Sequence, residues 1–332
     1  GDRWQVDTLL KQTGKLLKEL MATVQDPKAP ETDRVSAASQ AVDFGKKDSE
    51  LAKKLISIIT PQSNPDLARG LLEAIGKSEA AVGKEIVNAS TGWSPSIRGQ
   101  ALRLLGQRPA WTPALLDASE KGTLRLTDLT LDQQRALAEH PDRKVAGRAR
   151  TLLEKGGSLP NPDRQKVINQ LEAVAKRSGD ADQGKAVYVQ HCAKCHVHGS
   201  VTGPGIPAGG IGPDLSGMAA HPKEELLIHI MDPSRGVEGN FRTWTVLTKA
   251  GQIINGLMSS ETRTSLELID AEGKKHILNR SDIDEISVSP KSLMPEGFEK
   301  QLNEKALADL LEFMTRRGRF LTLPLDKVAT IA

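Results

Sequence analysis

The stretch HCAKCHVHGS, residues 191–200, contains both cysteines of this 332-residue chain. Cys192 and Cys195 lie three positions apart, and His196 follows directly. Two thiols and an imidazole within five positions form a Cys-x-x-Cys-His motif, which indicates that these side chains act together on one chemical group. The motif also lies near the point where the pattern of the sequence changes.

Three chemistries use two cysteines at this spacing. A thioredoxin-like redox pair begins a helix in a βαβ context, whereas here a helical pattern runs into the motif and a loop follows it. A structural zinc site needs four ligands, which would be Cys192, Cys195 and two histidines such as His196 and His198. The third chemistry is covalent haem attachment, for which Cys-x-x-Cys-His is the signature. We favour haem attachment and keep a zinc site as the alternative.

Length and composition limit the class of protein. A chain of 332 residues is expected to form about two domains. A content of 38% hydrophobic and 26% charged residues is typical of a soluble globular protein, and a net charge of +3 provides no basic stripe for nucleic acid. No apolar run approaches the roughly 18 residues needed to cross a bilayer. We therefore expect neither a nucleic-acid partner nor a transmembrane segment.

Residues 1–175 contain no cysteine and show the apolar spacing of successive helices. Four Ala- or Leu-rich stretches end in glycine, which predicts helix C-caps at Gly45, Gly76, Gly106 and Gly156. The first two intervals, 31 and 30 residues, suit a helical-hairpin repeat, and the third, 50 residues, indicates an irregular unit. This half resembles a degenerate HEAT-like α-solenoid. The alternative is an irregular helical bundle.

The second half has a different pattern. After a polar join at residues 176–185, where Asp180 or Asp182 can cap a helix, the chain reaches the motif and then a Gly- and Pro-rich loop, 201–217. A short helix is predicted within 222–234. Between Phe241 and Val288 five runs with a period of two predict a small antiparallel sheet. A closing helix follows, with Asn303 as its N-cap.

Residues 178–316 resemble a class I c-type cytochrome. The stretch GDADQGKAVYVQHCAKCH (179–196) is similar to the first helix and haem-binding site. GPDLSG (212–217) is similar to the loop under the proximal histidine, and SLMPEG (292–297) with KALADLLEFM (305–314) to the distal methionine loop and last helix.

The resemblance implies a role for each matching residue. Cys192 and Cys195 carry the thioether bonds to one haem c, and His196 is the proximal iron ligand. Pro213 accepts a hydrogen bond from the other ring nitrogen of His196, and Leu215 in the same loop contacts the haem. It also implies that Gly184 and Tyr188 meet Leu310 and Phe313 where the first and last helices cross.

Met294 is the expected distal iron ligand. Of the six methionines, only Met294 lies in a predicted loop, far enough after the proximal site to wrap a haem and before the last helix. Pro295 biases the preceding residue toward extended geometry. Arg242 and Trp244, at the start of the predicted sheet, can pair with a haem propionate. His191 and His198 are expected in solvated loop positions.

The β-like insertion narrows the resemblance to the haem-binding domain of planctomycete and verrucomicrobial type. In that family the domain commonly ends a secreted chain with HEAT-like repeats and a dehydrogenase portion. The expected fold is mainly α: a HEAT-like solenoid at 1–175, then a class I-like cytochrome c domain at 176–320. A β insertion at about 241–289 interrupts that domain, and a tail follows at 321–332.

The expected function is periplasmic electron transfer with His/Met ligation, not enzymatic catalysis. By resemblance, the donor is a sugar or alcohol dehydrogenase and the recipient a respiratory acceptor. Two alternatives remain: a haem enzyme or gas sensor with a labile distal ligand, and a zinc-binding helical-repeat scaffold.

Overall fold

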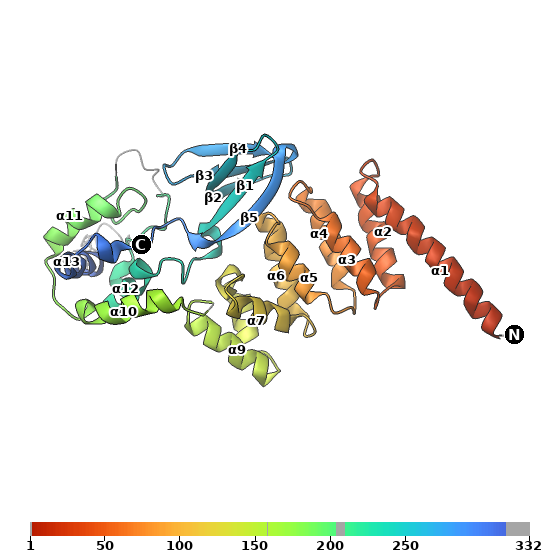
Figure 1. Ribbon diagram of the computed structural model, residues 1–332, viewed down its shortest axis with the longest axis horizontal. Helices are drawn as coiled ribbons and strands as arrows, with labels where there is room; N and C mark the ends of the chain where they lie inside the picture. Colours follow the sequence, from red (N-terminus) through yellow and green to blue (C-terminus); the bar gives the residue numbers. More distant parts are fainter. Residues whose placement is uncertain (1, 158, 204–209, 317–332) are drawn as a thin grey trace, which may run out of the picture. The chain divides into compact units, whose positions relative to one another are not determined.

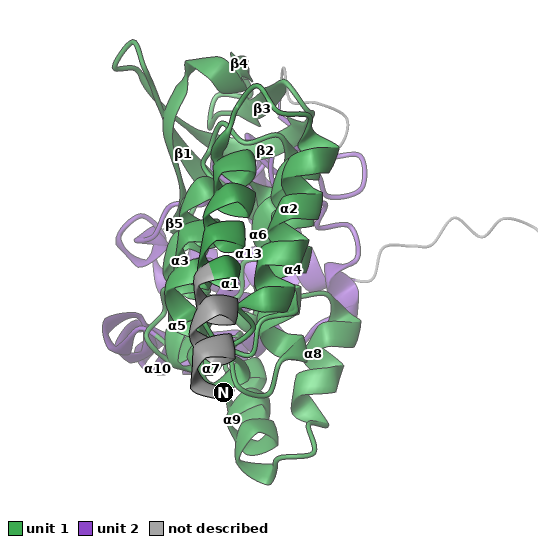
Figure 2. Ribbon diagram, turned by 90° about the vertical axis from the view of Figure 1, so that its right-hand side faces the viewer, with its two compact units in different colours: residues 1–160, 234–293 green, residues 161–233, 294–332 purple. Residues whose placement is uncertain are grey.

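The computed structural model describes residues 2–157, 159–203 and 210–316, with side chains from residue 12 onward. The chain divides into two compact units, residues 1–160 with 234–293 and residues 161–233 with 294–332 (Figure 2). The expected tail at 321–332 lies outside the described residues. Each unit is built from two separate parts of the sequence.

The first unit is a series of helices followed by a sheet (Figure 1). Helices α2, α4, α6 and α8 pack on one another in turn, and α3, α5, α7 and α9 form a second row. Four of these helices start at a side chain that caps the backbone, namely Asp48, Asn64, Thr130 and Asp142. In chain order the helices are α1 (Asp2–Gln25), α2 (Glu31–Phe44), α3 (Ser49–Ile58), α4 (Pro65–Gly76), α5 (Gly83–Ser90), α6 (Pro95–Gln107), α7 (Thr112–Glu120), α8 (Leu131–Ala138) and α9 (Arg143–Glu154).

The four predicted glycine C-caps have different outcomes. Gly45 is the C-cap of α2. Gly156 lies just beyond α9 at φ +86°, where a side chain would be strained. Gly76 and Gly106 are still helical, because α4 and α6 continue through them. The prediction was therefore wrong by one or two residues for these two.

Two buried tryptophans make the same kind of hydrogen bond, from the indole N–H to a backbone carbonyl, at two places in the helical core. The indole Nε1 of Trp93 donates to the Ile59 carbonyl at 3.0 Å, and that of Trp111 donates to the Ala80 carbonyl at 2.8 Å. Each ring is 1% exposed. The same bond, reaching back 34 and 31 residues, ties successive pairs of helices together.

The predicted sheet is confirmed as five antiparallel strands in the order β4-β3-β2-β1-β5. The turns between β1 and β2 and between β3 and β4 contain Gly251 and Gly273, both at φ +80°. One face buries Trp244, Val246, Leu268 and Ile286. The strands are β1 (Arg242–Thr248), β2 (Ile253–Glu261), β3 (Ser265–Ile269), β4 (Lys275–Asn279) and β5 (Ile283–Ser292).

The sheet is bonded into the helical unit. The Glu261 carboxylate accepts from the hydroxyls of Ser94 and Ser96 at 2.5 and 2.8 Å, and from Arg280 at 2.6 Å. We expected this sheet as an insertion in the cytochrome c domain. It is an insertion in sequence, but its contacts group it with residues 1–160, because its polar side chains find their partners there.

A buried ionic group forms a second link within this unit. Asp128 accepts from Arg98 and from Arg242, each at 2.6 Å, and all three side chains are at most 6% exposed. Arg98 precedes Asp128 in the helical part of the chain, whereas Arg242 begins β1. One carboxylate therefore joins the sheet to the helices.

The described part of the second unit has four α-helices around an apolar core. Of the two predicted capping residues, Asp180 and Asp182, it is Asp180 that caps α11. Asn303 caps α13, as predicted, by accepting from the Ala306 N–H at 2.9 Å. Residue 175 was the expected domain boundary, but α10 belongs to this unit. The helices are α10 (Pro162–Ala175), α11 (Ala181–His191), α12 (Lys223–Met231) and α13 (Glu304–Thr315), and this unit also has the short 3₁₀ turns η2 (Met218–Ala220) and η5 (Phe298–Lys300). The 3₁₀ turns of the first unit are η1 (Leu126–Asp128), η3 (Gly239–Phe241) and η4 (Arg280–Asp282).

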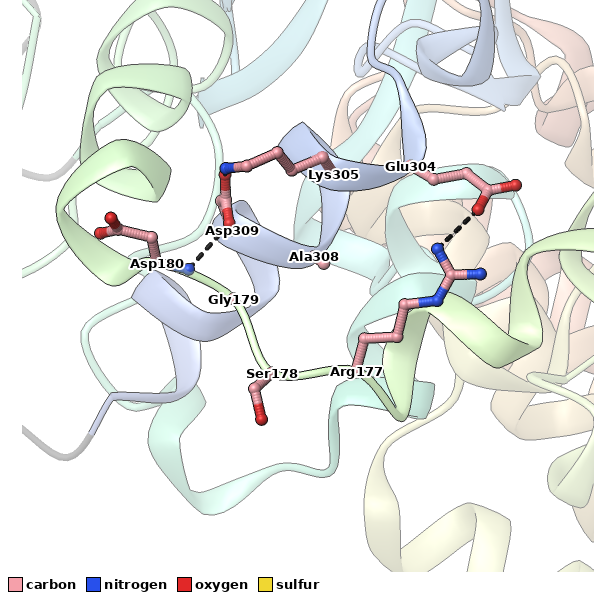
Figure 3. A pocket seen from close by; sticks show the side chains of 8 residues that line it. All are labelled: Arg177, Ser178, Gly179, Asp180, Glu304, Lys305, Ala308 and Asp309. Atoms are coloured by element: carbon pink, nitrogen blue, oxygen red, sulfur yellow. Dashed lines mark hydrogen bonds and ion pairs between the residues drawn. The ribbon is translucent and has the colours of Figure 1, made fainter.

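Helices α11 and α13 cross at Gly184. A Cβ there would collide with the Asp309 carbonyl oxygen and lie 2.8 Å from the Phe313 Cβ, so only glycine allows this approach. At the same junction, the Asp309 carboxylate accepts from the Asp180 N–H at 2.7 Å and from Lys305 at 2.6 Å (Figure 3). The last helix is thereby fixed on the helix that leads into the cysteine motif.

Candidate haem-attachment site

The Cys-x-x-Cys-His motif begins where α11 ends. The Cys192 N–H donates to the Tyr188 carbonyl at 2.8 Å, which closes the last helical turn. The N–H groups of Cys195 and His196 both donate to the Cys192 carbonyl at 3.0 Å. The motif is therefore a tight turn after a helix, as the sequence predicted.

Both cysteines are thiols that do not form a disulfide, and both are partly buried. Burial raises the pKa of the Cys192 thiol to about 12, with a smaller contribution from Cys195. A reactive thiol of a redox pair needs a depressed pKa. The surroundings of Cys192 therefore favour an attached or structural sulfur over a thioredoxin-like nucleophile.

His196 is held by the loop that follows the motif. Its Nδ1 lies 2.8 Å from the Pro213 carbonyl oxygen. A carbonyl only accepts, so Nδ1 carries the proton and Nε2 has the lone pair that can bind a metal. Burial lowers the pKa of His196, and the Pro213 carbonyl opposes that shift. The geometry thus favours a neutral imidazole with Nε2 as the ligating atom.

Backbone hydrogen bonds hold the proximal loop against the motif. The Cys195 carbonyl accepts from the Ile211 and Gly212 N–H groups, each at 2.9 Å. Gly203 on the other side of the loop donates to the Ala193 carbonyl at 2.8 Å. Six positions of the predicted Gly- and Pro-rich loop, 204–209, lie outside the described residues.

Met294 and the cysteine motif share one apolar core. Cys192, Leu215, Met218 and Met294 are all partly buried and pack against the core of the second unit. Met294 lies in the predicted loop between β5 and α13. Its role as the distal ligand stays a prediction. Met258 packs against the core of the sheet, whereas Met218 packs against the same core as Met294.

The structure corrects the expectation for Arg242 and Trp244. Arg242 donates to Asp128 at 2.6 Å and is 4% exposed. Trp244 is 2% exposed and belongs to the apolar core of the sheet. Both side chains are buried against partners within the first unit, so we no longer expect either of them to contact a haem propionate.

Three features of the site were missed in the sequence. Gly212 lies against the His196 ring, where a Cβ would be 2.5 Å from Cε1. His198 is not a solvated loop residue: it is half-buried, and its ring is tilted against Tyr188 and lies edge-on to Phe313. His191 is also half-buried and lies edge-on to Phe298, with ring centroids 6.4 Å apart. No pattern of spacing indicates these contacts, because they join segments far apart in sequence.

Part of the chain matches the model of a known protein family. The family model for cytochrome c oxidase, cbb3-type, subunit III matches residues 179–250. A search of curated proteins finds no significant match. The matched stretch contains Cys192, Cys195, His196 and Pro213, and it ends before Met294. Together with the geometry above, it supports a cytochrome c domain in this part of the chain.

A cytochrome c domain carries covalently bound c-type haem with iron, and the residues present fit that group. The two thiols lie on one turn, His196 presents Nε2, and apolar side chains around Cys192 remain partly uncovered. The Tyr188 hydroxyl is buried and has no hydrogen-bond partner among the described residues. Within the described ranges, no three His, Cys, Asp or Glu side chains form a group that could hold a metal ion by themselves.

Proposed function

We propose that this chain is an electron-transfer protein with one c-type haem, ligated by His196 and Met294. The observation that carries the proposal is the hydrogen bond of His196 to Pro213, next to the side chains of Cys192 and Cys195 on one turn, in a stretch that matches a cytochrome c family model. The shared apolar core of Cys192 and Met294 supports a binding site bounded by both segments.

Each residue has a defined task in this proposal. Cys192 and Cys195 each add sulfur and hydrogen across one vinyl group, which makes two thioether bonds. Pro213 fixes the orientation of His196 and strengthens it as a donor. Leu215 and Met218 exclude water from one side. When bound, the haem supplies an iron that gains or loses one electron; a methionine ligand favours the ferrous form more than a second histidine would.

The location and partners are part of the proposal. Covalent c-type attachment in bacteria takes place outside the cytoplasmic membrane, so we propose a periplasmic location. The donor would be a sugar or alcohol dehydrogenase, and the recipient a respiratory acceptor. None of the described helices has the length and apolar character needed to span a membrane.

The helical unit would act as a spacer or docking surface of HEAT-like type. Its two rows of helices and the repeated tryptophan bonds of Trp93 and Trp111 support this assignment. Each hairpin of such a repeat buries its apolar face against the next one.

The test is an alkaline pyridine spectrum of the full chain, produced in a host that matures c-type cytochromes. We expect the spectrum of covalent c-type haem from the native chain and none from the Cys192→Ala, Cys195→Ala variant. Zinc without iron in the native protein would establish the scaffold alternative. Rapid binding of carbon monoxide to the reduced protein would instead indicate a gas sensor or haem enzyme.

A further inference from the structure

His198 and Leu215 join the cysteine motif to the proximal loop. The His198 Nδ1 lies 2.7 Å from the Leu215 carbonyl oxygen, and the Leu215 N–H donates to the Val197 carbonyl at 2.8 Å. Since a carbonyl only accepts, Nδ1 of His198 carries the proton. Both backbone groups of Leu215 are thus held by the two residues that follow His196.

The His198 ring is itself fixed by two helices of the same unit. Its centroid lies 4.9 Å from that of Phe313 on α13 and 5.7 Å from that of Tyr188 on α11. Phe313 and Tyr188 also contact each other, at 5.4 Å. The three rings form one cluster, so His198 connects the helix crossing with the loop.

The next turn of the loop adds a smaller contact. The Gly199 N–H donates to Ser216 Oγ at 2.7 Å, and the Ser216 N–H donates to Asp214 Oδ1 at 2.8 Å. These bonds lie on the surface, whereas the His198 bond is partly buried. The His198 bond is therefore the partly buried side-chain restraint on Leu215, beside the backbone bond of Leu215 to Val197.

We propose that His198 is a positioning residue for the proximal ligand. By holding Leu215, it fixes the Pro213 carbonyl, two residues earlier, at the distance and angle that His196 Nδ1 requires. This inference rests on the proposed function, in which His196 ligates iron. Hydrogen bonds weaken steeply as their geometry departs from linear, so a small movement of Pro213 reduces the donor strength of His196.

The test compares three variants of the haem-loaded full chain. His198→Asn keeps an N–H group near the place of Nδ1 but removes the ring. His198→Gln carries the same amide one methylene further out. His198→Phe keeps a ring and removes the donor. The pyridine spectrum first reports whether haem is attached, and spectroelectrochemistry then gives the reduction potential.

The expected result is an upward shift of the potential in the Gln and Phe variants and little change in the Asn variant. A weaker Pro213 bond makes His196 a poorer donor, which stabilises ferric iron less. A tenfold change in the ferrous-to-ferric ratio would correspond to about 59 mV for a one-electron couple, and we expect a shift up to that size.

Three results would overturn the inference while leaving the proposed function intact. They are an equal shift in the Asn and Gln variants, loss of haem from the Asn variant alone, and unchanged potentials in both Gln and Phe variants. Failure of the native chain itself to attach haem would instead overturn the proposed function.

Discussion

The imidazole of His196 passes so close to Gly212 that a Cβ at position 212 would lie 2.5 Å from Cε1 and 2.9 Å from Nδ1. The same ring donates from Nδ1 to the Pro213 carbonyl, one residue further along. The proximal loop therefore positions His196 in two ways: the Pro213 carbonyl accepts a hydrogen bond from the ring, and Gly212 allows the ring to lie close to the backbone.

Gly212→Ala should displace the His196 ring, because neither the backbone nor the imidazole can yield without lengthening the Pro213 bond. Loss of such supporting contacts typically weakens a metal site by about 10- to 100-fold. We expect a larger fraction of high-spin ferric haem, measured by electron paramagnetic resonance. Gly217→Ala is the control, since nothing lies within 4 Å of a Cβ there. Equal spectra for both variants would contradict the prediction.

Met294→His should lower the reduction potential and abolish the sulfur-to-iron charge-transfer band of the ferric protein. A second imidazole favours ferric iron more than a thioether does. Absorption spectroscopy with potentiometric titration measures both effects. Met218→Leu and Met258→Leu should retain the band and the potential. If Met294→Ala kept the band and Met218→Leu lost it, Met218 would be the ligand.

Asp128→Ala should destabilise the first unit by about 3–5 kcal/mol, because it leaves two buried guanidinium groups without their shared carboxylate. Urea unfolding followed by tryptophan fluorescence reports on this unit, which contains all four tryptophans. The control is Asp117→Ala, which breaks a half-exposed pair with Arg148 and should cost less than about 1 kcal/mol. Similar losses in both variants would argue against a buried network.

Acidification should weaken the second unit below about pH 4, the usual range of carboxyl pKa values. Burial alone would raise the pKa of Asp309, but the Asp180 N–H and Lys305 outweigh it and hold that pKa below its usual value. Lys223 and the Gly179 N–H similarly lower the pKa of Glu312. A depressed folded pKa gives stability at neutral pH, which is lost as the pH falls through that pKa.

The matching experiment follows the thermal midpoint between pH 7 and pH 3 by haem absorbance. The Asp309→Asn, Glu312→Gln variant should be less stable at neutral pH and lose less on acidification. Glu304→Gln removes only an exposed pair with Arg177 and should behave as the native chain. An unchanged slope in the double variant would show that other groups control the acid response.

Without haem, the first unit should fold and the second should not. In the Cys192→Ala, Cys195→Ala variant, the free energy of haem binding no longer contributes to folding. Limited proteolysis with mass spectrometry should recover protected fragments from residues 1–160 and also from 234–293, because Glu261 and Arg242 bond the sheet into the helical unit. Equal resistance of both units would refute this expectation.

Local patterns predicted much of the fold. Alternating apolar residues predicted all five strands, and capping residues predicted the start of α13 at Asn303 and that of α11 at Asp180 or Asp182, of which the structure has Asp180. These features depend on neighbours within a few positions, where side-chain spacing and capping chemistry act directly. The local pattern also predicted that Cys192, Cys195 and His196 follow directly after a helix, because that prediction again depends only on neighbouring residues.

By itself, then, the sequence determined the helices and strands, the haem-attachment motif, and the bond from His196 to Pro213 expected by resemblance. Only the tertiary structure decided that Arg242 bonds to Asp128, that Trp244 lies in the sheet core, and that the sheet groups with the helical unit. The hydrogen bond between His198 and the Leu215 carbonyl was likewise found only in the tertiary structure. A buried charge or imidazole takes whichever partner the packed chain brings within hydrogen-bonding distance, and residues distant in sequence become neighbours only through that packing.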